Sequence, residues 1–427
     1  MIAKLKHIFS GDLFKVSSLN AVSTVIKMLT GLVSVKVVAA IIGPAGIALL
    51  GQLNNFSTIT LGVSSAGINA GMTKYVSEYS NSRKKYLLFL GSGYWITILF
   101  SILTSIVLII GAGYFSKLIL LDEKYRFVFY FFGGTIILYA LNALLISVIN
   151  GFKEYKKYII ANILGSIVGL IFSVVLSIKY GVSGALISVV TFQSIVFLLT
   201  LAIIHKSYWF EWKTFTRKFS WLVAGRLGHY SMMALVSAVV VPVSQLIIRS
   251  YIRKNEGIIN AGLWEGINRI SAMYLLVITT SLSVYYLPRL AELRSKQELR
   301  REISSVYKLI IPLLIAATIV IYIVRKFIIQ LLFTREFAGM QDLFGFQLIG
   351  DIFKMAGWIL GYLMIAKAMT KTYITMEFVS YSGQVLFSCG FVVLYGTVGA
   401  TIGYAVGNLL YFVIMIIIFR KVLFNYE

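Results

Sequence analysis

Twelve apolar stretches, each about as long as a bilayer core is thick, occupy most of this chain. A transmembrane helix needs about 20 predominantly apolar residues. Hydrophobic residues make up 59% of the 427 residues and charged residues only 13%, whereas about a quarter of an ordinary soluble domain is charged. The stretches cover residues 16–41, 45–72, 86–112, 124–150, 158–178, 183–205, 221–250, 259–288, 304–324, 340–367, 373–394 and 398–419. The sequence therefore predicts an all-α integral membrane protein with 12 transmembrane helices.

The positive charge of the chain is spread unevenly over the connections between these stretches. A net charge of +23 would indicate a nucleic-acid partner in a soluble protein, but in a membrane protein it is typical of cytoplasmic loops. If the N-terminus is cytoplasmic, the cytoplasmic segments carry 23 lysines and arginines and the opposite ones carry 10. We therefore expect a multi-pass protein with both termini in the cytoplasm and no nucleic-acid partner.

The two halves of the chain repeat each other. Residues 179–206 and 394–421 match at an offset of 215, in the same helix order and direction. Six spans per half then give both halves one orientation, related by a pseudo-two-fold axis along the membrane normal. We predict an N-terminal six-helix bundle at 1–206, a cytoplasmic linker at 207–220 and a C-terminal six-helix bundle at 221–427. Transporters built in this way bind their substrate between the halves.

Three cations, Lys27, Arg269 and Lys354, lie near the middle of three different apolar stretches. A charged side chain at the bilayer centre costs roughly 2.5–3.5 kcal/mol. Lys27 lies about 16 Å along its helix, close to the expected midplane. Because this cost arises at three positions, we expect the chain to bind an anion inside the membrane. Lys74, at the end of the second stretch, is a further candidate for binding it.

Two of these cations have an acidic neighbour at helical spacing. Glu265 precedes Arg269 by four residues, and Asp351 precedes Lys354 by three, so each pair lies on one helix face. Either the members neutralise each other as internal pairs, or the carboxylate holds the cation until an anionic ligand competes for it.

A set of polar side chains within the apolar stretches is expected to line a substrate cavity between the two halves. Asp351, Glu265, Glu377 and His229 are candidates for carrying a proton or another coupling ion. Histidine in particular titrates near neutrality. Alternatively, Glu377 pairs with a nearby lysine and His229 is a helix-end residue satisfied by water. The cavity candidates are Asn20, Gln52, Asn55, Asn162, Tyr381 and Gln384.

The motifs of familiar enzymes are absent from the sequence. There is no Gly-Lys dipeptide, so a P-loop is excluded, and no metal-ligand cluster, nucleophile elbow or dinucleotide fingerprint occurs. We therefore expect a protein that is not an enzyme and has no cofactor. Its energy source is expected to be an ion gradient, the membrane potential or the concentration gradient of the substrate.

Four segments carry a resemblance to a known family. They are GPAGI at 43–47, AGINAGMTKYVSEY at 66–79, SLSVYYLPRL at 281–290 and DLFGFQLIGDIFKMAGWILGYLMIAKA at 342–368. With them the chain resembles the Wzx-type flippases of O-antigen units or lipid III. This polysaccharide transport family shares a superfamily with the multidrug and toxin extrusion transporters.

The resemblance implies a two-bundle fold with a central cavity and alternating access. It also implies that undecaprenyl-diphosphate-linked oligosaccharide moves from the cytoplasmic to the periplasmic leaflet of the bacterial inner membrane. Expected partners are this lipid-linked oligosaccharide, membrane lipids, and the polymerase and chain-length regulator of the glycan pathway.

Not every candidate residue lies in a segment that matches the family. The resemblance covers essentially the whole chain. Lys27, Lys74, Asp351, Lys354 and Glu377 lie where the chain matches the family pattern, whereas His229, Glu265 and Arg269 lie where it departs from that pattern. Two alternatives stay open. One is an ion-coupled multidrug or small-molecule antiporter of the same superfamily, and the other is a scaffold for polysaccharide assembly.

Overall fold

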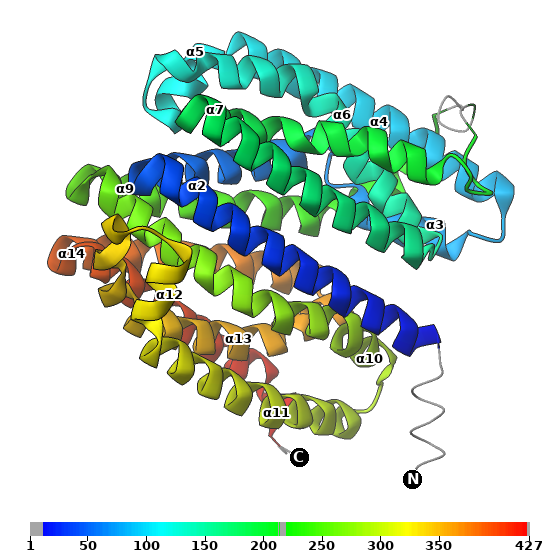
Figure 1. Ribbon diagram of the computed structural model, residues 1–427. Helices are drawn as coiled ribbons and strands as arrows, with labels where there is room; N and C mark the ends of the chain where they lie inside the picture. Colours follow the sequence, from blue (N-terminus) through cyan, green and yellow to red (C-terminus); the bar gives the residue numbers. More distant parts are fainter. Residues whose placement is uncertain (1–11, 212, 214–218, 425–427) are drawn as a thin grey trace. The chain divides into compact units, whose positions relative to one another are not determined.

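The computed structural model describes residues 12–211, 213 and 219–424, except for the side chains of residues 12–21, 229 and 230. The described part is almost entirely helical (Figure 1). Its elements are α2 (Asp12–Ser64), α3 (Asn69–Glu78), α4 (Arg83–Ile110), α5 (Ala112–Phe115), η1 (Ser116–Leu120), η2 (Glu123–Tyr125), α6 (Arg126–Gly151), α7 (Tyr155–Ile204), α9 (Trp221–Ser281), η3 (Leu282–Tyr286), α10 (Leu287–Glu292), α11 (Lys296–Ile323), α12 (Arg325–Leu332), η4 (Arg335–Leu343), α13 (Phe344–Ala366) and α14 (Thr370–Leu423).

The predicted number of membrane spans is confirmed within the described residues. Eight helices are long and apolar enough to cross a membrane by length and composition. Four of them, α2, α7, α9 and α14, are broken by one glycine each, which divides the eight into twelve spans. The breaks lie at Gly43, Gly181, Gly257 and Gly396, where φ is 63°, 55°, 90° and 59°. Glycine adopts positive φ without the steric penalty of a side chain.

These backbone breaks follow the internal repeat of the sequence. Gly181 and Gly396 are separated by the repeat offset of 215 residues, and Gly43 and Gly257 by one residue less. Lys153 and Ala368, also 215 residues apart, both adopt positive φ, at 58° and 52°. The two halves therefore repeat their turns as well as their apolar stretches.

The second predicted span, at 45–72, is too long. The helix ends at Ser64, and a turn with positive φ at Ala66 and Gly67 separates it from α3. At Gly67 the chain passes close to α9, because a Cβ there would lie 2.6 Å from Leu235 Cγ. Asn69 therefore begins α3 instead of continuing the helix that carries Gln52.

The chain forms two compact units. The first comprises residues 1–41 and 52–239, and the second comprises residues 42–51 and 240–427. The core of the first is built around buried side chains of α3, α4 and α6, such as Met72, Leu90 and Val148. That of the second is built around α11, α13 and the end of α14. The units divide inside α9, so the division into two six-helix bundles at 207–220 stays a prediction.

The segment that follows α7 is anchored in the core of the first unit. Trp209 is 1% exposed and stacks on Phe152 at 5.0 Å between ring centroids. Its Nε1 donates to Glu154 Oε2 at 3.1 Å, and Glu154 also pairs with Lys157 Nζ at 2.8 Å. The start of the connection between α7 and α9 is therefore packed into the core of the first unit.

At Gly403 the two segments of α14 pack closely against each other, which gives a stability prediction. A Cβ at Gly403 would lie 2.3 Å from the backbone of Ser388, which cannot move aside as a flexible side chain does. Gly403→Ala is expected to lower the free energy of unfolding by about 1–3 kcal/mol through overpacking. Thermal unfolding of the purified protein in detergent measures this.

The same helix supplies the matched control for Gly403→Ala. A Cβ at Gly390 would meet no neighbouring atom within 4 Å, so Gly390→Ala is expected to be neutral or stabilising by up to about 1 kcal/mol. Equal unfolding temperatures for the two variants would contradict the close packing at Gly403.

Candidate functional site

Lys354 lies on α13 with its ammonium group held between aromatic rings. Its Nζ is 5.0 Å from the ring centroid of Trp358, one turn along α13, and 5.7 Å from that of Tyr404 on α14. Aromatic faces attract a cation through their negative quadrupole. Among the described residues, Lys354 forms no ion pair within 4.0 Å, so the ammonium keeps its hydrogen-bond donors for another partner.

Asp351, expected to pair with Lys354, is engaged elsewhere. The carboxylate is fully buried and accepts hydrogen bonds from Ser271 Oγ at 2.6 Å, from Tyr404 Oη at 2.7 Å and from Tyr274 Oη. Gln347 Nε2 in turn donates to Ser271 Oγ at 3.2 Å. A buried carboxylate with three hydroxyl donors is well satisfied, and these bonds tie α9, α13 and α14 together beside Lys354.

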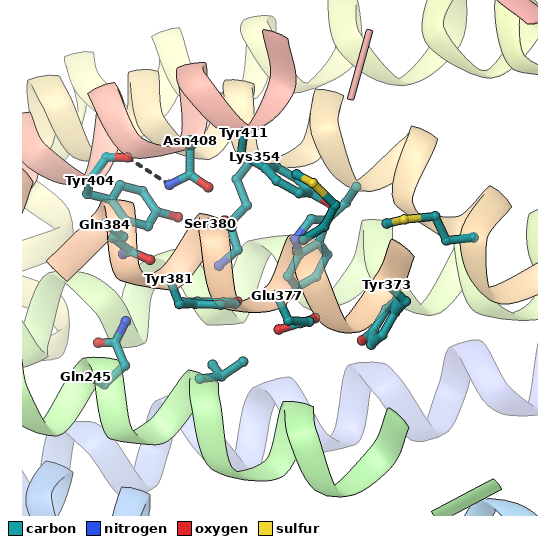
Figure 2. A pocket seen from close by; sticks show the side chains of 14 residues that line it. Gln245, Lys354, Tyr373, Glu377, Ser380, Tyr381, Gln384, Tyr404, Asn408 and Tyr411 are labelled. Atoms are coloured by element: carbon teal, nitrogen blue, oxygen red, sulfur yellow. Dashed lines mark hydrogen bonds between the residues drawn. The ribbon is translucent and has the colours of Figure 1, made fainter. Parts of the chain in front are cut away.

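A small polar cavity in the second unit brings several predicted residues together. Its volume is about 60 Å³, which is room for a few water molecules. Figure 2 shows the side chain of Lys354 directed toward Tyr381 and Tyr404, with Glu377 close by. The lining side chains with polar atoms are Gln245, Lys354, Trp358, Tyr373, Glu377, Ser380, Tyr381, Gln384, Tyr404, Asn408 and Tyr411.

Four of these lining residues were predicted from the sequence, and most of the others were not. Lys354, Glu377, Tyr381 and Gln384 were expected in a cavity and lie in this one. The missed residues Tyr404, Asn408 and Tyr411 recur at spacings of four and three, which places them on one helix face. That periodicity within the last apolar stretch was the available signal. Asn408 donates to Tyr404 O at 2.8 Å, so its amide is partly used within the helix.

Glu265 stands between two arginines. Its Oε1 accepts from Arg269 Nε at 3.0 Å, as the spacing of four predicted, and its Oε2 from Arg249 Nη2 at 2.5 Å. The side chains of Arg249 and Glu265 are 3% and 10% exposed. The three side chains together carry one formal positive charge.

Arg249 is the residue of this cluster that was not among the candidates from the sequence. It is buried and stacks over Trp264 at 5.5 Å. The Glu265 carboxylate also packs against Gly51, where a Cβ would lie 2.5 Å from the carboxylate carbon. Arg269 is therefore part of a three-residue cluster rather than of a simple pair.

In the first unit, Lys27 contacts one other predicted cavity residue. Lys27 Nζ donates to Asn162 Oδ1 at 3.3 Å, while Asn162 Nδ2 donates to Tyr158 O at 2.8 Å. Asn162 therefore links the cation on α2 to α7. Lys27 itself is exposed, so the amide orients a cation that stays accessible.

The remaining predicted residues of the first unit are placed separately. Gln52 is buried, at 3% exposure, and Asn55 is half-buried. Lys74 is exposed on α3, with its Nζ 4.7 Å from the Tyr75 ring centroid. The side chains of Asn20 and His229 lie outside the described residues. No group of three or more His, Cys, Asp or Glu suited to a metal ion is found in the described part of the chain.

The cations of these sites supply groups that can bind anions. Lys354 and Lys27 present ammonium donors, and the Glu265 cluster has an excess of guanidinium. Lysine and arginine are suited to phosphate groups, arginine through its planar fork. Around Lys354, tyrosine hydroxyls and amides supply neutral hydrogen-bonding partners.

Comparison with known proteins relates the whole chain to membrane transporters. A family model described as polysaccharide biosynthesis protein matches residues 13–294. The lipid III flippase of Escherichia coli (strain K12) is 30% identical over 416 residues, which covers 94% of this chain and 96% of that protein. The lipid III flippase of Shigella flexneri matches with the same identity and coverage.

Solved structures share the fold at low sequence identity. An inward-facing multidrug resistance MATE family transporter of the MOP superfamily has a TM-score of 0.80 and 13% identity, covering 93% of this chain and 94% of that one. A MOP superfamily transporter from Pyrococcus furiosus has a TM-score of 0.74 and 13% identity, covering 96% of both chains. The predicted all-α fold of two helical bundles is thereby confirmed.

Proposed function

The chain belongs to the polysaccharide biosynthesis protein family, and we propose that it is a flippase that moves a lipid-linked oligosaccharide across the membrane. The observation that carries this proposal is the similarity to two lipid III flippases over 94% of the chain. Accessible cations on membrane-spanning segments support it, because a lipid-linked oligosaccharide has an anionic phosphate group that must cross hydrocarbon.

We assign the recognition of this phosphate group to the cations of the spans. The cargo is proposed to be undecaprenyl diphosphate carrying an O-antigen unit or the glycan of lipid III. Lys354 and Lys27 are the main contacts, because each presents an ammonium group beside neutral polar side chains. Arg269 and Lys74 are secondary contacts. Hydrogen bonds to charged groups contribute about 1.5–3 kcal/mol each, enough to offset part of the cost of moving the diphosphate out of water.

We assign the polar residues to binding of the glycan, and the titratable residues to coupling of transport to a proton or another ion. Amide and hydroxyl groups match the donors and acceptors of sugar hydroxyls, and Asn20, Gln52, Asn55, Asn162, Tyr381 and Gln384 take this role. Among the coupling candidates Asp351, Glu377, Glu265 and His229, we favour Glu377. Asp351 and Glu265 are held by buried partners, whereas Glu377 lines the same cavity as Lys354.

The size of the cavity bears on how the cargo enters. Ligand pockets usually measure about 300–1,000 Å³, far more than the roughly 60 Å³ beside Lys354. An oligosaccharide therefore requires the surrounding helices to move apart, which is the motion that alternating access supplies. We propose transport in this manner from the cytoplasmic to the periplasmic leaflet of the inner membrane, with the termini in the cytoplasm. The polymerase and chain-length regulator act on the delivered units.

Complementation tests this proposal. The full chain is expressed in a bacterial host that lacks its own lipid III and O-antigen flippases, and surface glycan is measured by gel and antibody. The expected result is restored glycan for at least one of the two cargo types. Resistance to cationic drugs without restored glycan, at normal protein abundance, would favour the multidrug antiporter instead.

A further inference from the structure

A basic groove runs along the first half of α11, in the second unit. It is lined by Gln297, Arg300, Arg301, Ser304, Ser305 and Lys308, all of them exposed, and has a volume of about 570 Å³. Three of the six side chains are cationic, the other three are neutral hydrogen-bonding groups, and none is acidic. The proposed transport function uses none of these residues.

Helical spacing keeps the basic groove on the outside of the unit. A capping box starts the helix, with Ser295 Oγ accepting from Glu298 N at 3.2 Å. Arg300, Ser304 and Lys308 then follow at intervals of four residues, which stacks them on one face. On another face of the same helix, Leu299, Ile303 and Val306 are buried in the core. The core therefore fixes the rotation of α11 and directs the groove outward.

The position of the groove along α11 matches the headgroup level of a bilayer. Large apolar side chains become exposed directly after Lys308, with Leu309 at 70% and Leu313 at 63%. Such exposure on a membrane span is typical of contact with lipid tails. Arg300 lies eight residues before Lys308, about 12 Å at the helical rise. The headgroup layer on each side of the hydrocarbon is about 5–8 Å thick, so side chains from this stretch reach the phosphates.

The acids of this stretch are engaged away from the groove. Glu298 accepts from the backbone nitrogen of Ser295 at 3.4 Å, and Glu302 lies 3.9 Å from Arg289 Nε. Neither lines the groove. The groove is therefore lined by three cations and no acid, so it is positively charged at the headgroup level of the bilayer.

We propose that the basic groove binds the phosphate headgroup of an anionic phospholipid. The three cations supply charge, and the hydroxyls of Ser304 and Ser305 supply donors for the non-bridging phosphate oxygens. Basic side chains near an anionic membrane surface contribute about 1 kcal/mol each. The occupant is a lipid of the surrounding bilayer rather than the transported cargo, so the site stands independently of the proposed function.

Lipid titration of the purified full-length protein tests the groove. Phosphatidylglycerol is added in detergent, with phosphatidylcholine as the neutral comparison, and bound lipid is counted by native mass spectrometry. The variant R300Q/R301Q/K308Q is expected to bind phosphatidylglycerol more weakly by roughly fivefold per cation removed, which corresponds to about 1 kcal/mol each. Wild-type binding is also expected to weaken as salt rises, because exposed charges are screened.

A matched triple variant distinguishes binding of lipid in the basic groove from general attraction of lipid to surface charge. K84Q/K156Q/K371Q removes three exposed lysines that lie outside the basic groove, and its affinity for phosphatidylglycerol is expected to stay within threefold of wild type. Equal losses in the two triple variants would overturn the proposal, as would salt-independent binding. Competition by inorganic phosphate at the lipid's own concentration would also overturn it, because it would indicate a site for free phosphate. Unfolding temperatures confirm that each variant is folded.

Discussion

Replacing Lys354 with methionine is expected to abolish at least nine-tenths of glycan transport while the protein stays folded and abundant. Methionine keeps an unbranched apolar stem that packs against Trp358 and Tyr404, so the change removes mainly the charge. A hydrogen bond to a charged group contributes about 1.5–3 kcal/mol, and tenfold in rate corresponds to about 1.4 kcal/mol. Surface glycan in a flippase-deficient host, normalised to protein abundance, measures the effect.

Two variants make the Lys354 experiment specific. Lys354→Arg retains a cation and is expected to keep a large part of the activity. Lys371→Met removes an exposed lysine outside the cavity and is expected to leave transport unchanged. Full complementation by Lys354→Met would refute the role of this cation in transport, and the same substitution at Lys27 tests the cation of the first unit separately.

Replacing Glu265 with glutamine is expected to cause the largest loss of stability in the second unit. The change leaves Arg249, whose side chain is 3% exposed, without its carboxylate partner and removes the partner of Arg269 as well. Breaking a buried ion pair by removing one member costs about 3–5 kcal/mol, because an uncompensated charge stays buried. We expect a lower unfolding temperature in detergent and less protein in the membrane.

A second substitution distinguishes an uncompensated charge from a simple packing defect. Arg249→Met removes the guanidinium that has lost the Glu265 carboxylate, so the double variant E265Q/R249M is expected to recover a substantial part of the lost stability, as a double-mutant cycle measures. Gly51→Ala probes the same place from α2, since its Cβ would lie 2.5 Å from the Glu265 carboxylate carbon. An unfolding temperature of Glu265→Gln equal to that of wild type would show that the cluster is not needed for stability.

The features that the sequence predicted correctly depend on local spacing. Span number follows from the length of apolar stretches, because each helix satisfies its own backbone hydrogen bonds in lipid. The pairing of Glu265 with Arg269 follows from a separation of four residues on one helix. Lys354 was identified because a cation in the middle of an apolar stretch is conspicuous without any knowledge of its neighbours.

The partners of these residues depended on contacts between distant segments. Asp351 was expected to pair with Lys354 three residues on, yet its carboxylate is held by hydroxyls from α9 and α14. Arg249 reaches Glu265 across the break at Gly257, a contact between two segments of α9 that spacing along one helix does not predict. Spacing along one helix gives no information about which face of another helix lies opposite.

Twelve membrane spans in two repeated halves, with cations inside the spans, can be read from the amino-acid sequence alone. These properties belong to single helices, where hydrophobic length and the helical period decide them. Which cations are neutralised and which stay available depends instead on how the helices pack against one another. Arg249 and Arg269 share one carboxylate, whereas Lys354 faces a polar cavity beside aromatic rings. That difference arises because a buried charge is stabilised only by groups that packing brings within hydrogen-bonding distance.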